Sequence, residues 1–201
     1  MIDAIKIYLG GLGEIRSGYP LRGAISPVSG GSTLVVQMRD VASDRPLHWP
    51  AVVRTELTGR QMPEWLTDGD VLLVTRGNRY YAVALENVPD RTVSGPHLYH
   101  LRLKPNSRLL PAFLAWQLNQ SPIQRHLHQA AEGSNQLSIR RAELEALSIS
   151  VPPIVDQQRI VRLAELAARE RVLLEQLIRN REQELGALAL VLAGPIDTLN
   201  N

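Results

Sequence analysis

The chain contains no cysteine, which excludes disulfide bonds and thiolate metal sites. It also lacks any run of about 18 apolar residues, the minimum for a membrane-spanning helix, and its N-terminus does not have the layout of a signal peptide. We therefore expect a soluble cytoplasmic protein with no membrane partner. With 201 residues, 44% of them hydrophobic, the chain suffices for one hydrophobic core and one appendage.

Lysine is nearly absent, because Lys6 and Lys104 are the only two lysines among 22 basic residues. Any basic surface therefore consists of arginine, whose planar group suits bidentate contacts to phosphate or guanine. Residues 1–155 carry 14 Arg and 2 Lys against 13 acids, a net charge of +3, whereas residues 156–201 carry 6 Arg against 7 acids, a net charge of −1. The basic excess thus lies in the first three quarters of the chain.

The sequence also lacks a recognisable catalytic constellation. His126 and His128 are two residues apart on an expected helix, so they point to different faces and cannot form a metal pair at i and i+4. The other three histidines have no carboxylate at motif spacing, and Asp68 and Asp70 flank Gly69 as turn-forming residues do. We expect no metal, no cofactor and no catalytic residue in this chain.

The most regular stretch is the run after Pro152 and Pro153, which continues to about residue 193 and contains no further proline. Double proline suits the entry of a helix, and Asp156 suits its first turn. At 100° per residue the apolar residues form one stripe, so this long helix needs a partner, either its own globule or another helix. The stripe consists of Ile160, Leu163, Ala167, Leu174, Leu177, Ile178, Leu185, Leu188 and Leu192.

The rest of the chain predicts a mixed α/β domain. Short apolar runs indicate strands at 33–38, 52–53, 71–75, 80–85, 98–103 and 148–151, and residues 17–32 are typical of a loop. Two of these runs flank the turn Arg76-Gly-Asn-Arg79, which indicates a hairpin. Helices are expected at 111–118, 121–131 and 138–147. The predicted fold class is α+β.

Five segments in this order resemble the DNA-specificity (S) subunits of type I restriction-modification systems. The closing pattern is the most specific, because a short helix, a strand, a double proline, Gln-Gln-Arg-Ile and a long helix follow one another. The segments are Thr67–Gly77, Pro111–Leu114, Gly133–Gln136, Leu144–Pro153 and Gln157–Ile160.

S subunits usually hold two target-recognition domains and two long helices, whereas this chain has one of each. The resemblance therefore implies a half-size S subunit with a target-recognition domain at 1–151, a dimerisation helix at 152–194 and a tail at 195–201. It implies that two copies pair through the stripe residues from Ile160 to Leu188 in an antiparallel coiled coil. Such a homodimer would read a bipartite inverted repeat in double-stranded DNA.

The resemblance further implies that the chain is not an enzyme. An adenine methyltransferase subunit with S-adenosylmethionine would modify the DNA, and a restriction subunit with ATP and magnesium would cut it. Two alternatives stay open: a coiled-coil adaptor that binds protein, and a DNA-binding component of another phage-defence system.

The residues we expect to face DNA lie in two segments, the hairpin turn and the glycine loop, with three further positions elsewhere. Arginine can bind guanine and asparagine or glutamine can bind adenine, while other arginines hold phosphates. The alternative for each residue is a solvated loop position. The set is Arg76, Asn78 and Arg79 in the turn, Ser134, Asn135 and Gln136 in the loop, and Arg39, His48 and Arg91.

Overall fold

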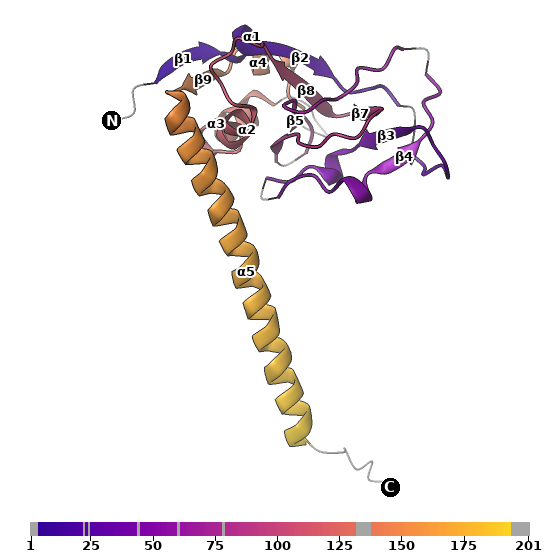
Figure 1. The fold of residues 1–201 in the computed structure, drawn as a ribbon, viewed down its shortest axis with the longest axis vertical. Coiled ribbons are helices and arrows are strands. Elements are labelled where there is room, and N and C mark those ends of the chain that lie inside the picture. The colour runs from indigo at the N-terminus through magenta and orange to yellow at the C-terminus, as the bar shows by residue number, and fades with distance from the viewer. Residues whose placement is uncertain are drawn as a thin grey trace. The chain divides into compact units, whose positions relative to one another are not determined.

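A computed structural model describes residues 4–21, 23, 25–43, 45–59, 61–77, 79–131 and 138–193. The chain divides into one compact unit, Met1–Val161, and a second unit, Arg162–Asn201, which is the remainder of a single helix and the tail. Figure 1 shows the elements of each. The mixed α/β fold with a long C-terminal helix is confirmed.

The strand β5 (Val71–Val74) lies at the centre of the compact unit. It belongs to a four-stranded antiparallel sheet in the order β2 (Gly13–Ser17), β8 (Leu98–Leu103), β5 and β6 (Ala82–Ala84). Successive side chains of a strand point to opposite faces, and here both faces are covered. Val71 and Leu73 join one hydrophobic cluster and Leu72 and Val74 join another, which explains the continuous apolar run.

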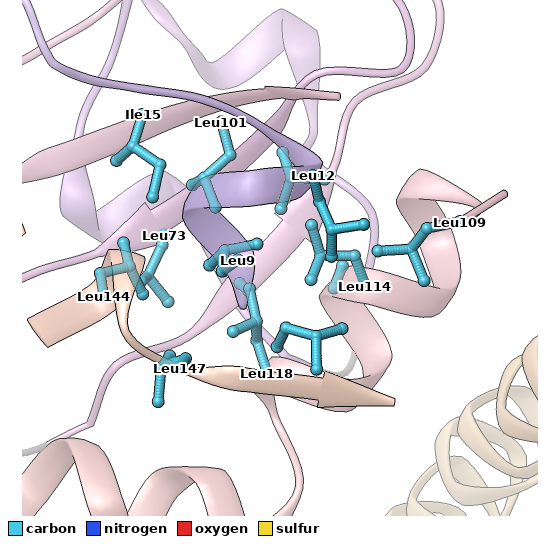
Figure 2. Packing of buried hydrophobic residues seen from close by; sticks show 14 of the residues in the cluster. Leu9, Leu12, Ile15, Leu73, Leu101, Leu109, Leu114, Leu118, Leu144 and Leu147 are labelled. Atoms are coloured by element: carbon cyan, nitrogen blue, oxygen red, sulfur yellow. The ribbon is translucent and has the colours of Figure 1, made fainter. Parts of the chain in front are cut away.

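Helices cover one face of this sheet. The first cluster contains leucines of α1 (Leu9–Leu12), α2 (Pro111–Leu118), α3 (Ser121–Ala130) and α4 (Arg141–Glu145), packed against β2, β5 and β8 (Figure 2). The two-stranded antiparallel sheet of β1 (Ile5–Tyr8) and β9 (Ser148–Val151) adds the buried residues of β9. This cluster joins the beginning and the end of the compact unit.

A second sheet packs against the other face. It has three strands in the order β4 (Val53–Thr55), β3 (Thr33–Val36) and β7 (Thr92–Ser94), and β3 pairs antiparallel with β4 and parallel with β7. Apolar residues of β3 and β5 share the second cluster. The compact unit is therefore built of helices, a four-stranded sheet and a three-stranded sheet in three layers.

Most of the expected elements are present, with shorter bounds at several strands. The expected strand 33–38 ends at Val36, because Met38–Asp40 forms a 3₁₀ turn in which Asp40 caps the Gln37 N–H. A second 3₁₀ turn, Trp49–Ala51, precedes β4. The expected helix 138–147 is wrong at its start: α4 begins at Arg141, and Ser138 instead forms an antiparallel bridge with Arg76. The elements α1, β2 and β7 had not been expected.

The helix α5 (Ile154–Ala193) has 40 residues, in agreement with the expectation. At 1.5 Å per residue its length is about 60 Å. Its start is fixed by Gln157, which is fully buried: Leu110 N–H donates to its Oε1 at 2.8 Å, and its Nε2 donates to the carbonyls of Arg108 and Pro152 at 2.7 and 2.8 Å. The first glutamine of the Gln-Gln-Arg-Ile pattern therefore has a structural role.

We predict that Gln157→Ala lowers the free energy of unfolding by about 2–4 kcal/mol, because it removes three hydrogen bonds and leaves the N–H of the half-buried Leu110 without its partner. The neighbouring Gln158 is exposed, so Gln158→Ala should change stability by less than about 0.5 kcal/mol. Urea unfolding of both variants at equal protein concentration measures the difference. Equal effects of the two substitutions would contradict the assigned role of Gln157.

Candidate nucleic-acid interface

The turn from Thr75 to Tyr81 lies at one end of the four-stranded sheet, between β5 and β6. Val74 N–H donates to the Tyr81 carbonyl at 2.8 Å and closes the hairpin. Gly77 has a φ of +110°, a conformation that favours glycine and lets the chain reverse between Arg76 and Arg79. The expected hairpin is thus confirmed, and it presents two arginines within four residues.

Both arginines of the turn have a partner that orients them. Arg76 Nη1 lies 3.2 Å from His97 Nε2, and Arg79 Nη1 donates to the Tyr81 hydroxyl at 3.0 Å. Partial burial, with a smaller contribution from the Arg76 charge, lowers the pKa of His97 from its usual value. The imidazole is therefore neutral at neutral pH, and its Nε2 can accept the Arg76 N–H.

The backbone next to the turn connects it to other loops. Thr75 N–H donates to the His97 carbonyl at 2.9 Å, and Gly95 N–H donates to the Val36 carbonyl at 2.7 Å. The ends of β3, β5 and β7 and the start of β8 therefore meet, and Arg39 follows the end of β3 by three residues. Of the expected DNA-facing residues, Arg39, Arg76 and Arg79 lie at this end.

The residues that follow the second expected segment in the sequence pair with the hairpin turn. Ser138 pairs with Arg76, and Ile139 N–H donates to the Thr75 carbonyl at 3.1 Å. The segment that begins at Ser138 therefore lies directly beside the hairpin turn. Four residues of the expected set, Asn78, Ser134, Asn135 and Gln136, lie outside the described residues.

Two other expected residues are located elsewhere. Arg91 lies at the start of β7, where its side chain donates to the Ser32 carbonyl at 3.1 Å and stacks over the Trp65 ring at 5.4 Å. Its guanidinium is thus engaged in the fold. His48 is exposed next to Trp49, whose indole N–H donates to the Glu86 carbonyl at 2.9 Å beyond the far end of β6. The structure does not bring either residue to the turn.

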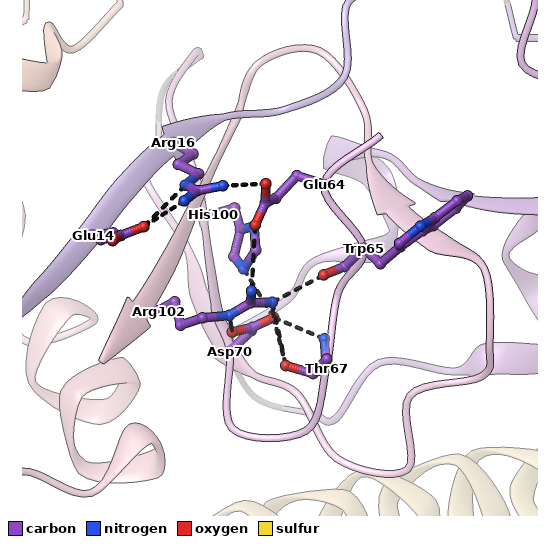
Figure 3. Close-up of polar contacts among 8 residues, drawn as sticks. All are labelled: Glu14, Arg16, Glu64, Trp65, Thr67, Asp70, His100 and Arg102. Carbon is purple, nitrogen blue, oxygen red and sulfur yellow. Dashed lines mark hydrogen bonds and ion pairs between the residues drawn. The ribbon is translucent and has the colours of Figure 1, made fainter. Parts of the chain in front are cut away.

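An ion-pair network around the buried carboxylate of Asp70 occupies the opposite end of the four-stranded sheet. Asp70, 2% exposed, accepts two hydrogen bonds from Arg102, at 2.8 Å to Oδ1 and 2.7 Å to Oδ2, and one from Thr67 N–H at 2.8 Å (Figure 3). His100 Nε2 lies 2.8 Å from the same carboxylate. Glu64 joins Arg102 to Arg16 on β2. His100 has no carboxylate at motif spacing, as the sequence analysis states, but the sheet brings it to Asp70, which is 30 positions away.

The network fixes the charge of Asp70. Burial alone would raise the pKa of its carboxyl, but the hydrogen bonds from Arg102 and the contact with His100 outweigh burial and lower the pKa well below its usual value. The carboxylate is satisfied by residues of the fold and ties the turn of residues 67–70 to β8. We assign it a structural role, in agreement with the expectation that Asp70 forms a turn.

Sequence reasoning missed the residues that support the turn, because none of them belongs to a motif. Asn119 exchanges two hydrogen bonds with the backbone of Ala82, at 2.9 and 2.8 Å, and covers the open edge of β6. Gln124 does the same for Tyr80, at 3.3 and 2.9 Å. The side-chain amides of Asn119, which follows α2, and of Gln124 on α3 therefore take the place of a fifth strand beside the hairpin.

The apolar residues of α5 are largely exposed. Leu163 is 69% exposed and Leu174 is 53% exposed, and the other expected interface residues beyond position 160 are exposed as well. Ile160 differs, since it packs against the first hydrophobic cluster. Leu166, Leu173 and Val191 are also exposed and lie on a flank about 90° from the stripe. The helix thus carries apolar residues on more than one side.

Among the described residues, no group of acids and histidines could hold a metal ion, and no helix is long and apolar enough to cross a membrane. No protein-family model matches the sequence, and no curated protein matches it.

Solved structures do match, and they define the fold as that of the specificity subunits of type I restriction-modification systems. The S subunit from M. genitalium is 18% identical, with a TM-score of 0.56 over 90% of this chain and 43% of that chain. The HsdS subunit from Thermoanaerobacter tengcongensis is 20% identical, with a TM-score of 0.61 over 92% of this chain and 42% of that chain.

A third match comes from a structure that describes complex assembly and conformational transition of the type I system; it is 19% identical, with a TM-score of 0.59 over 92% of this chain and 43% of that chain. The chain therefore spans less than half the length of the proteins it matches. The resemblance expected from the sequence is confirmed at the level of the fold, with a single domain of this kind.

We predict that Asp70→Asn lowers the free energy of unfolding by about 3 kcal/mol at neutral pH, because Arg102 and His100 lose their charged partner. Asp68→Asn, in the same turn but exposed, should have a small effect. Because the folded-state pKa of Asp70 is lowered, its contribution is complete above the unfolded-state value of about 4 and declines as the pH falls below that value. Urea unfolding of the wild-type protein and of Asp70→Asn from pH 7 to pH 3 should show the difference between their free energies of unfolding becoming smaller. A constant difference would contradict the ion-pair explanation.

Proposed function

We propose that the chain is a DNA-specificity subunit of a type I-like restriction-modification complex, in half-size form. The observation that carries the proposal is the S-subunit fold together with the arginine turn Thr75–Tyr81, which lies beside the segment that begins at Ser138. Its arginines are held by uncharged partners, so their charge remains available for DNA. Arg76 and Arg79 would bind guanine edges or phosphates, and the remaining members of the expected set would extend the contact.

The chain holds one recognition domain, so a bipartite site would require two copies. We propose a two-fold homodimer in which α5 pairs antiparallel with its counterpart through the stripe residues after Ile160. Each recognition domain would then read one half of an inverted repeat. The exposed apolar flank with Leu166 and Leu173 remains free in such a pair and would accept another helix.

The catalytic steps would belong to partner subunits. An adenine methyltransferase subunit would bring S-adenosylmethionine, and a restriction subunit, where the system has one, would bring ATP and magnesium. This chain would supply the DNA contact and the α5 scaffold on which those subunits assemble. Its place would be the cytoplasm, where it meets the DNA.

We predict that DNA affinity falls steeply with salt, because several phosphates are neutralised on binding. Substituting Arg76→Ala together with Arg79→Ala should flatten the plot of log affinity against log salt by about one for each arginine that binds a phosphate. Fluorescence anisotropy with a labelled duplex measures both slopes. Arg54→Ala, on the edge strand β4 of the other sheet, is the control and should keep the slope.

If the wild-type protein and the double variant bind DNA equally and without salt dependence, the turn has no role in DNA binding. A protein that binds no DNA under any condition but retains a helical partner would favour the adaptor alternative.

We predict that Leu174→Glu together with Leu177→Glu yields monomers, because four charged side chains would have to be buried in a two-fold seam. Light scattering gives the mass of each species, and Arg169→Glu with Arg179→Glu serves as a control on the side of the helix away from the stripe. A dimer that persists in the first variant would place the interface elsewhere.

A further inference from the structure

The chain contains a long stretch without any acidic residue. Between Asp90 and Glu132 the sequence has no aspartate or glutamate, whereas it has four arginines and one lysine there, a local charge of +5. Four of the five histidines lie in the same stretch. The whole of the helix α3 lies in the last part of this stretch, and the exposed residues of the helix include Arg125, His126 and His128.

Three of the five cations of this stretch are used by the fold; among the described residues, the exposed side chains of Arg108 and Arg125 are not, and only Arg125 lies on α3. Arg102 is paired with Asp70, Lys104 donates to the Gly11 carbonyl at 2.9 Å, and Arg91 donates to Ser32. Within the described residues, the exposed Arg125 guanidinium makes no hydrogen bond and no ion pair. No acid on α3 competes for it.

The helix α3 is fastened to the hairpin turn. Gln124 holds both backbone groups of Tyr80, the residue that directly follows Arg79, and the His128 ring lies 5.0 Å from the Tyr80 ring. Tyr80 is fully buried, so this contact fixes the position of the helix relative to the turn.

The helical geometry decides which side chains lie toward the turn. At 100° per residue, Gln124 and His128 share the flank that contacts Tyr80, and Arg125 lies about 60° from His128 on the outward side. His126 is about 160° from His128, on the opposite flank. Arg125 and His128 are therefore the basic residues of α3 nearest to the turn.

We propose that α3 is a second contact element for the DNA backbone. Arg125 binds a phosphate beside the half-site that the Thr75–Tyr81 turn contacts, and His128 lies next to Arg125 on the helix. The inference rests on the proposed function and adds residues to its site. Phosphate contacts set the position and register of a protein on the duplex, whereas base contacts give sequence preference. Arg125 therefore positions the turn and does not select the sequence.

The test is the salt dependence of duplex binding by Arg125→Gln in the full-length chain. We expect affinity at low salt to fall by about tenfold and the salt slope to shrink by about one, equally for all duplex sequences. Arg125→Lys keeps the charge and should keep the slope, and Arg54→Gln is the control for removal of one exposed arginine. Because Arg125 is exposed, the unfolding midpoint should stay at the wild-type value.

The outcomes separate this inference from the proposed function. If Arg125→Gln keeps the wild-type slope while the turn variants bind DNA more weakly, α3 makes no phosphate contact and the DNA-reading role stands. A change in sequence preference without a change in slope would also overturn the inference. If the wild-type protein binds no duplex, both the inference and the proposed function fail.

Discussion

Burial of β5 on both faces is the constraint on which the rest of the compact unit depends. Its four apolar residues alternate between two hydrophobic clusters, so helices must cover one face of the sheet and a second sheet must cover the other. The strand also has two chemically different ends. Asp70 precedes it in an ion-pair network, and Thr75 and Arg76 follow it in an open basic turn.

The two ends differ in how their charged groups are paired. At the first end, carboxylates and arginines satisfy one another, which ties the strands together and leaves little charge for a ligand (Figure 3). At the second end, Arg76 is hydrogen-bonded to the neutral imidazole of His97 and Arg79 to the hydroxyl of Tyr81. These partners orient the guanidinium groups without neutralising their charge. A surface that attracts phosphate requires the second kind of support.

The sequence predicted the central strands and the long helix well, because their signals are local. Val71–Val74 is an apolar run, and α5 has a proline entry followed by 40 residues without another proline. The elements that were missed have weak local signals: α1 contains two glycines, and β7 has only three residues.

The candidate site was predicted in part. Arg76 and Arg79 were identified because a turn between two apolar runs exposes its polar residues. The supports of that turn, His97 and Gln124, come from distant segments and carry no motif. Arg91 was assigned to DNA from its charge alone, and only the structure shows that Ser32 and Trp65 engage it. Pairing of His100 with Asp70 likewise depends on strand register, which the sequence does not reveal.

The central claim is that two copies of this chain read an inverted repeat. The most direct measurement is selection of the purified protein against a pool of randomised duplexes at low salt, with and without a methyltransferase subunit, followed by sequencing of the retained DNA. The account predicts enrichment of two inverted half-sites separated by a spacer of fixed length. Absence of any enriched sequence in both conditions would contradict it.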